Sequence, residues 1–318
     1  MREAIINAIP QNLRYSLSVG IGLFIVYIGL KNGGLIVAND ANVTALGPWT
    51  ASSLLAMTGI LIGAILMALK VSGALFYTII AMTIIGIPFA VTHIPEEFSL
   101  VSLPASLEPI AFHLDFGRFV ALDVEYLVVI FVLLFMDLFD TLGTLIGTST
   151  SAGMTDPKTG HIHGLNRALM ADAIGTTAGA LCGTSIVTTY VESTTGIAAG
   201  GRTGLTSFTV AMLFLVALFF SPLFLMIPSA ATTSALVLVG VLMMCTISKI
   251  EFHDVTEVVP SFITIIMMPF AASISEGIVL GMLSYIIIKV CSGRHKEIST
   301  VMYILAVFFV LKYVAPLI

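Results

Sequence analysis

Residues 131–147 read FVLLFMDLFDTLGTLIG, an apolar run that carries Asp137 and Asp140 three positions apart. This spacing places both carboxyl groups on one face of a helix. An acidic side chain at the centre of a lipid-exposed helix costs about 2.5–3.5 kcal/mol, so this face must turn towards other helices or a watery pocket. Desolvation and a neighbouring carboxyl group both favour the protonated form of such an acid. The pair therefore suits a site that takes up and releases protons.

The composition of the chain points to lipid as its surroundings. Of its 318 residues, 58% are hydrophobic and only 10% are charged, and the mean hydropathy is +1.09. A soluble domain carries about 25% charged residues. We therefore predict an all-α polytopic membrane protein. The three cysteines follow no disulfide or metal-binding pattern, and the sequence holds no nucleotide-binding or nucleic-acid-binding motif.

Apolar stretches long enough to span a membrane recur along the chain. They lie near 13–31, 51–69, 71–91, 126–149, 168–187, 204–226 and 228–247. A further stretch, 257–291, is interrupted around Pro269 and Ser273 and predicts a short span followed by a full one. The final apolar run, 299–316, fits either a span or an interfacial helix.

Residues 187–203, VTTYVESTTGIAAGGRT, are too polar for a lipid-facing helix. The threonines and tyrosine at the start favour extended backbone. A short helix is expected to begin near Ser193 and to end at the glycine pair. A strand followed by a half-helix near 187–203 is typical of the broken, substrate-binding segment of a secondary transporter. Glu192, at the junction, would meet free backbone N–H groups and the positive end of the helix dipole.

The acids of these two segments could approach one ligand from two sides. Asp137 and Glu192 would act as hydrogen-bond acceptors, which suits a neutral or cationic ligand rich in N–H donors and suits an anion poorly. For Asp140, a hydrogen bond to a neighbouring helix fits as well as a direct role. Three other acids near span ends are interpreted as interfacial charges: Asp172, Glu251 and Glu276. His161 and His163 are assigned to a solvated loop without a third metal ligand.

The positions of the basic residues predict an orientation. If the N-terminus is cytoplasmic and segment 188–200 counts as one crossing, ten basic residues face the cytoplasm and only Lys31 and Arg118 lie outside, with Lys312 unassigned. The ten are Arg2, Arg14, Lys70, Lys158, Arg167, Arg202, Lys249, Lys289, Arg294 and Lys296. Without that crossing the split would be five inside and seven outside. We therefore predict a multi-pass protein of the plasma (inner) membrane with a cytoplasmic N-terminus.

Four motifs together resemble one transporter family. They are REAIINAIPQNLRYSLSVGIGLFIVYIGLKNGG (2–34), FMDLFDTLGTLIG (135–147), SAGMTDPKTGHIHGLNRALMADAIGT (151–176) and GTSIVTTYVESTTGIAAGGRTGL (183–205). They resemble the nucleobase permeases of the xanthine/uracil permease superfamily, and more narrowly its AzgA-like hypoxanthine/guanine/adenine branch. The resemblance runs essentially from end to end of the chain.

The resemblance implies a 7+7 inverted-repeat transporter fold with a core and a gate domain. It implies import of purine nucleobases together with protons, and no cofactor other than this coupling ion. Asp137 and Glu192 would hold the base from two sides, with Thr189 and Ser193 as polar neighbours. Asp137, Asp140 and Glu192 would be the candidates for proton coupling, and Asp140 would have an accessory influence on transport.

The resemblance also implies a division of the chain. Residues 1–91 would hold gate-domain spans like the fifth to seventh, and 92–125 an extracytoplasmic connector. Residues 126–226 would hold the core spans like the eighth to eleventh, and 227–318 gate-domain spans and a C-terminal segment. Four further spans would precede this pattern, so we expect an N-terminally truncated chain that does not transport alone.

Three alternatives compete with purine import. A uracil or xanthine permease differs only in its substrate. An anion transporter of similar fold is disfavoured because Glu192 would repel the anion. An intramembrane aspartyl protease is disfavoured because the GxGD motif is absent and two acids on one helix cannot flank a scissile bond. Whether two copies form a homodimer is left open by the residues.

Overall fold

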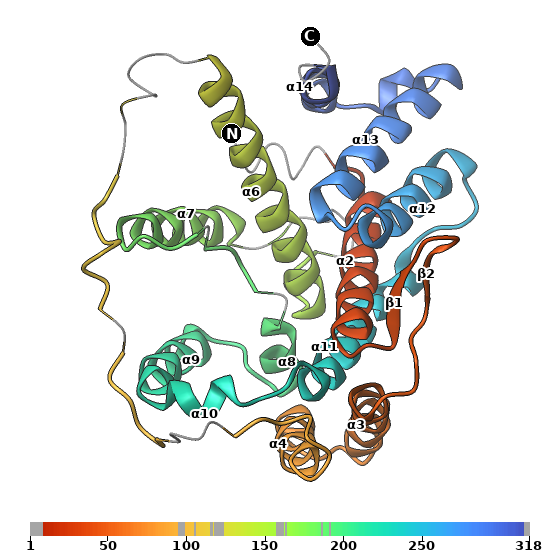
Figure 1. The fold of residues 1–318 in the computed structure, drawn as a ribbon. Coiled ribbons are helices and arrows are strands. Elements are labelled where there is room, and N and C mark those ends of the chain that lie inside the picture. Colours follow the sequence, from red (N-terminus) through yellow and green to blue (C-terminus); the bar gives the residue numbers. More distant parts are fainter. Residues whose placement is uncertain are drawn as a thin grey trace. The chain divides into compact units, whose positions relative to one another are not determined.

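The computed structural model describes residues 9–94, 99–104, 106–114, 117, 124–156, 162, 164–185, 187–190 and 192–314. The described chain is mostly helical (Figure 1). In chain order its elements are α2 (Gln11–Asn32), β1 (Ile36–Asn39), β2 (Val43–Leu46), α3 (Ala51–Ala68), α4 (Ala74–Gly86), α6 (Val124–Ser151), α7 (Leu165–Leu181), α8 (Ser193–Ala198), α9 (Gly204–Ala217), η1 (Leu218–Phe220), α10 (Ser221–Leu225), α11 (Ser229–Met244), η2 (Cys245–Lys249), α12 (Val255–Phe270), α13 (Ile274–Cys291), η3 (His295–Glu297) and α14 (Thr300–Val314).

The chain folds into two compact units. Unit 1 comprises Met1–Ile21, Ser106–Ser193 and Met243–Ile318, and unit 2 comprises Gly22–Ala105 and Thr194–Leu242. These units group residues by their contacts. The division into gate and core spans stays a prediction.

Five helices of the described chain are long and apolar enough to cross a membrane. They are Gln11–Asn32, Ala51–Ala68, Gly204–Leu225, Ser229–Lys249 and Ile274–Cys291. Each coincides with a stretch predicted from the sequence. The predicted interruption near Ser273 is also present, because α12 and α13 are separate helices and the Ser273 hydroxyl caps α13 by accepting from the N–H of Glu276 at 3.3 Å.

The predicted span at 71–91 is too long. Only α4 is helical there, and its thirteen residues stop at Gly86. Pro88 has no N–H to donate to the carbonyl of Ile84, so the helical hydrogen-bond ladder cannot continue through it. A helix of this length covers about 20 Å, less than the hydrocarbon thickness of a bilayer.

The prediction of an all-α chain is also corrected. Strands β1 and β2 form an antiparallel two-stranded ribbon in which Ile36 pairs with Leu46 and Asn39 with Val43. The connecting turn is held by the side chain of Asn39, whose Oδ1 accepts from the N–H groups of Ala41 and Asn42, both at 3.0 Å. The β-branched residues on both sides of this turn are the hairpin signal that the helical reading missed.

Unit 2 is built around a small apolar core. Its buried members are Leu35, Leu55, Ala56, Met82, Ala230 and Ala231, which come from the connection between α2 and β1, from α3, from α4 and from α11. The hydroxyl of Thr233 donates to the carbonyl of Gly29 at 3.0 Å and ties α11 to α2. These contacts fix the base of the ribbon, because Leu35 lies directly before β1.

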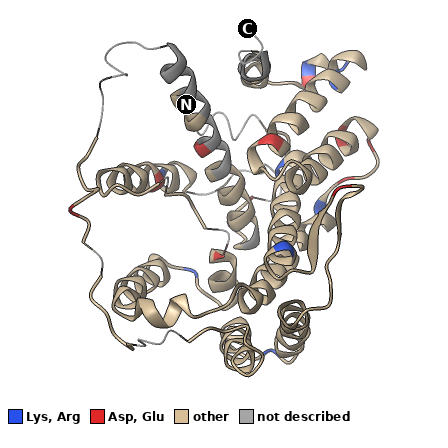
Figure 2. Cartoon of the chain, in the orientation of Figure 1, with Lys and Arg blue, Asp and Glu red and all other residues tan. Residues whose placement is uncertain are grey.

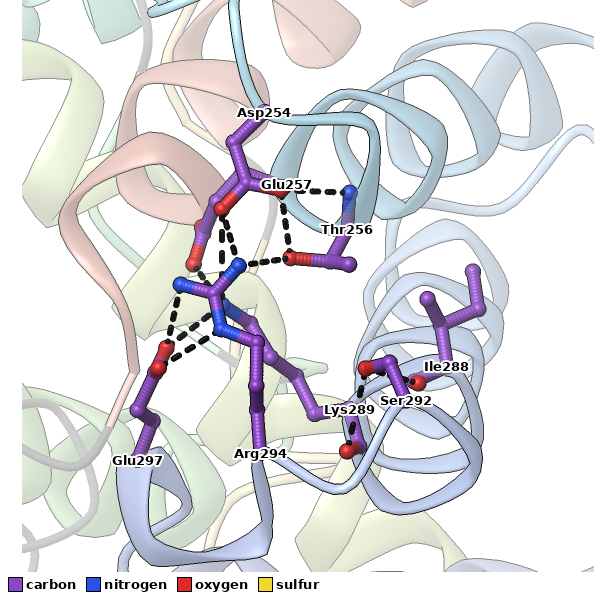
Figure 3. Close-up of polar contacts among 8 residues, drawn as sticks. All are labelled: Asp254, Thr256, Glu257, Ile288, Lys289, Ser292, Arg294 and Glu297. Carbon is purple, nitrogen blue, oxygen red and sulfur yellow. Dashed lines mark hydrogen bonds and ion pairs between the residues drawn. The ribbon is translucent and has the colours of Figure 1, made fainter.

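Unit 1 contains a helical hairpin of α12 and α13, and ion pairs join the start of α12 to the end of α13. Charged residues are sparse along the helices (Figure 2), but five of them gather where α12 begins and α13 ends (Figure 3). The side chain of Lys289 is fully buried, and its Nζ lies 2.8 Å from Glu257 Oε1 and 2.7 Å from Glu297 Oε2. Arg294 contacts the other side of Glu297, with Nε 2.6 Å from Oε1. It also pairs with Asp254.

The cluster has a buried centre, formed by Lys289 and Glu257, and a more exposed rim, formed by Asp254, Arg294 and Glu297. Glu257 is 18% exposed, whereas Asp254, Arg294 and Glu297 are 36%, 40% and 44% exposed. Lys289 stands in the last turn of α13 and Glu257 in the first turn of α12, so each charge also complements its helix dipole. The buried lysine is therefore stabilised only because carboxylates surround it.

Removing the central charge should destabilise the fold far more than removing a charge at the rim. Lys289→Met removes the cation that pairs with Glu257 and leaves Arg294 as the partner of Glu297, which should cost about 3 kcal/mol of unfolding free energy. Arg294→Gln breaks pairs that water screens and should have a smaller effect. Thermal unfolding of the purified variants in detergent, followed by circular dichroism, measures both. Equal losses would contradict the distinction between centre and rim.

The rim should also make stability depend on pH. Hydrogen bonds from Thr256 and Arg294 lower the pKa of Asp254 from 3.8 to about 2, and Arg294 and Lys289 lower the pKa of Glu297. Because these pKa values are lower in the folded than in the unfolded chain, their stabilisation is complete above about pH 5 and is lost as the pH falls towards 2. The unfolding midpoint should drop across this window, and Asp254→Asn should flatten the drop. An unchanged slope in that variant would contradict the assignment.

Candidate functional site

The acidic motif lies on α6, a helix of 28 residues in unit 1. Asp137 is half-buried, and its Oδ1 atom is buried. Asp140 belongs to the same helix one turn later, but its side chain lies outside the described residues. Beyond it, residues 141–150 are all buried, and five of these ten carry hydroxyl groups. The acids thus stand where α6 enters the interior of its unit.

The neighbouring helix α7 is joined to α6 directly after the acidic motif. The hydroxyl of Thr141 donates to Asp172 Oδ2 at 3.2 Å. Asp172 is half-buried, and the sequence did not predict this contact, whereas its interpretation as an interfacial charge stays a prediction. Sequence reasoning missed it because an acid eight positions into a helix looks the same in the sequence whether it faces water or a neighbouring hydroxyl. The signal available was the polar content of α7, which is unusual for a lipid-facing helix.

One turn further along α7, Thr176 reaches the segment that leads to Glu192. Its hydroxyl donates to the carbonyl of Val187 at 2.7 Å. The side chain of Val187 packs over two glycines of α7: a Cβ at Gly179 would lie 2.7 Å from Val187 Cγ2, whereas one at Gly175 would lie 3.7 Å from Cγ1. Because Asp172 and Thr176 are four positions apart, one face of α7 holds both α6 and the segment after Val187.

The broken segment itself is confirmed in part. Helix α8 begins at Ser193 and is followed by two glycines, with the N–H of Gly201 donating to the carbonyl of Gly196 at 2.9 Å. Residues 187–190 form no strand, since no described segment pairs with them and Thr176 occupies the carbonyl of Val187. Glu192 directly precedes α8 and is exposed, as is Ser193, whereas Thr189 is half-buried.

The structure thus places the predicted site residues Asp137, Thr189, Glu192 and Ser193 in unit 1. It connects the two acidic segments through α7 by the hydrogen bonds of Thr141 and Thr176. That both acids grip one ligand stays a prediction. His161 and His163 lie outside the described residues, and the described part of the chain shows no cluster of metal-ligating side chains.

Comparison with known proteins decides what kind of protein carries this arrangement. The sequence model described as Permease family, for xanthine and uracil permeases, matches residues 1–280. The chain belongs to this permease family. The resemblance of its motifs is thereby confirmed, and the chain is a membrane transport protein and not an enzyme. The protease alternative is excluded.

Related permeases match almost the whole chain. A putative permease of Methanocaldococcus jannaschii is 45% identical over 315 residues, which are 99% of this chain and 71% of the relative. The adenine permease AdeQ of Escherichia coli is 40% identical over 99% of this chain and 70% of its own length. The guanine/hypoxanthine permease PbuO of Bacillus subtilis is 40% identical over 97% of this chain and 72% of its own length.

The contact between α7 and Val187 should tolerate a methyl group at one glycine and not at the other. Gly175→Ala and Gly179→Ala both gain about 1 kcal/mol in helix propensity. In Gly179→Ala the new methyl group would overlap Val187, so overpacking should outweigh this gain by about 1–2 kcal/mol. Thermal unfolding and limited proteolysis between 183 and 203 would show destabilisation in Gly179→Ala alone. Faster proteolysis in both variants would contradict the predicted packing.

Proposed function

We propose that this chain takes part in the import of purine nucleobases (hypoxanthine, guanine and adenine) by proton symport. The observation that carries the proposal is the acidic pair, one acid on α6 and one at the start of α8, in a chain whose relatives at about 40% identity are named adenine and guanine/hypoxanthine permeases. The protein would lie in the inner membrane with its N-terminus in the cytoplasm, as the distribution of its basic residues favours.

The chemistry of a purine base matches acids on two segments. A purine is neutral and flat, with N–H donors and ring-nitrogen acceptors around its edge. Asp137 and Glu192 would accept from these N–H groups, and Thr189 and Ser193 would add hydroxyl groups that can donate or accept. A carboxyl group that binds a proton together with the base would also couple the two fluxes, and Asp140 stands one turn from Asp137 on α6.

The hydrogen bonds that α7 makes with α6 and with Val187 would hold the two acids in fixed positions relative to each other. A hydrogen-bonding ligand is held only if its partners stay within a few tenths of an ångström, which needs rigid supports behind them. Asp172 and Thr176 supply such supports by fastening α6 and the segment at Val187 to one helix face. Substrate binding would therefore depend on residues that never touch the base.

Transport of xanthine or uracil is the second candidate. A relative of Schizosaccharomyces pombe that is named a putative xanthine/uracil permease is 32% identical over 91% of this chain, against 40% for AdeQ. The greater identity to the purine permeases favours adenine, guanine and hypoxanthine. Competition between unlabelled bases separates the candidates.

Uptake by a chimera tests the proposal. This chain would replace the matching 315 residues of AdeQ, and the chimera would be expressed in cells that lack purine uptake. We expect accumulation of labelled purine that falls when a protonophore removes the proton gradient. Unlabelled adenine, guanine or hypoxanthine should compete, and uracil should not. The unfused chain is measured in parallel.

The acids are tested in the same chimera. Asp137→Asn and Glu192→Gln each replace a charge-assisted acceptor by an amide and should lower uptake at least about 100-fold, because each hydrogen bond to a charged group contributes about 3 kcal/mol when buried with its ligand. Glu251→Gln makes the same chemical change at an exposed acid between η2 and α12 and should leave uptake unchanged. Normal uptake in both site variants, at equal membrane levels, would overturn the assignment.

A further inference from the structure

Large apolar side chains are exposed where the ribbon of unit 2 meets helix α3. Leu46, at the end of β2, is 69% exposed, and Trp49 is 60% exposed. Leu54, in the second turn of α3, is 49% exposed. A tryptophan directly before an N-cap usually packs against the residue at the fourth helical position, which here is Leu54. Both remain open, so this surface, which we call the Trp49 patch, faces something other than the core of its unit.

The patch is held rigidly. Leu35 at the other end of the ribbon is only 5% exposed and belongs to the unit 2 core. The N–H of Gly47 donates to the carbonyl of Leu35 at 2.9 Å, and a Cβ at Gly47 would overlap the carbonyl of Gly34. The two ends of the ribbon are thus fastened to each other and to α3. The backbone that carries Leu46 is thereby held in place, and Leu46 and Trp49 both lie on the surface of the unit.

The backbone N–H groups at the start of α3, beside the patch, depend little on water as a hydrogen-bond acceptor. Thr50 and Ser53 form a capping box: the hydroxyl of Thr50 accepts from the N–H of Ser53 at 3.2 Å, and the hydroxyl of Ser53 accepts from the N–H of Thr50 at 2.8 Å. Backbone donors at a helix start are otherwise satisfied by water, so a start that carries its own acceptors tolerates poorly hydrated surroundings.

The patch continues into an apolar stripe on α3. Leu61 and Ile65 are each 56% exposed and lie seven and eleven positions after Leu54, on the same helix face. Helix α3 is one of the five membrane-length helices, and its 18 residues cover about 27 Å, close to the hydrocarbon thickness of about 30 Å. When this stripe faces lipid, the start of α3 lies at one boundary of the bilayer, and Trp49 lies at that depth.

We propose that Leu46 and Trp49 form a lipid anchor that sits at the boundary between the headgroups and the acyl chains of the bilayer. Tryptophan is enriched at this depth because its ring is apolar while its N–H can reach water or a headgroup. The exposed turn Asp40–Asn42 is polar and stays in water, so the ribbon enters the boundary by its base. The anchor fixes the depth of α3 in the bilayer, and it does not depend on the proposed substrate.

The chain offers a direct test because Trp49 is its single tryptophan. The whole protein is reconstituted in phosphatidylcholine vesicles whose acyl chains carry bromine near the headgroup, midway or near the chain end. We expect the greatest loss of Trp49 fluorescence with bromine near the headgroup, and weak quenching by aqueous iodide. Strong iodide quenching without bromolipid quenching would place Trp49 in water and overturn the proposal. Protection from both quenchers would show that protein covers it, such as a second copy, and would also overturn it.

Variants on the two faces of the ribbon give matched controls. Leu46 pairs with Ile36, whereas Val43 pairs with Asn39 on the opposite face and is 80% exposed. Leu46→Asp should reduce quenching by the shallow bromolipid and increase quenching by iodide, and Leu46→Ser should do the same to a smaller extent. Val43→Asp should change neither. If the two aspartate variants behave alike while circular dichroism shows intact helices, the Leu46 face is not an anchor.

Discussion

Polar and charged groups that are removed from water must find partners within the protein, and in a chain with so few charges this constraint explains most of the polar contacts that the structure describes. Lys289 is buried without exposure, and carboxylates from the start of α12 and from η3 meet it at hydrogen-bond distance. Asp172 is half-buried and accepts from Thr141. In the second half of α6, the hydroxyl groups of Thr144 and Thr148 donate to carbonyls of their own helix. The helices pack so that these buried polar groups lie next to hydrogen-bond or ion-pair partners.

Features that depend on a local stretch of sequence could be predicted, whereas contacts between residues far apart in the sequence could not. Long apolar runs fix the membrane-length helices, and the serine cap at Ser273 separates α12 from α13, so both were predictable. The contacts between side chains that lie far apart in the sequence were not predictable. The sequence does not show that Lys289 faces Glu257, 32 positions earlier, or that Thr141 faces Asp172, because either acid could as well face water. The ribbon was missed because its strands are only four residues each, beside helices of 18 and 22 residues.

At the candidate site, too, local features were predictable and contacts between distant segments were not. The junction of Glu192 with a short helix was predictable from the polar run and its glycines. The role of α7 was not, since it depends on three weak features that act together: an acid, a threonine one turn later, and a glycine whose missing side chain admits Val187. None of these is a motif alone. Together they make α7 the common support of both acidic segments.

The acids of the α12–α13 hairpin differ from those of helix α6 in whether basic residues accompany them. At the α12–α13 hairpin two cations balance most of the charge of three carboxylates, all within one network, so these acids have their counter-ions built in. Helix α6 carries Glu125, Asp137 and Asp140 and holds no lysine or arginine of its own. An acid on such a helix is stabilised by hydrogen-bond donors or by taking up a proton. A neutral ligand with N–H donors and a mobile proton would supply both, so the symport proposed for this chain would account for acids that a purely structural helix would have replaced with apolar residues.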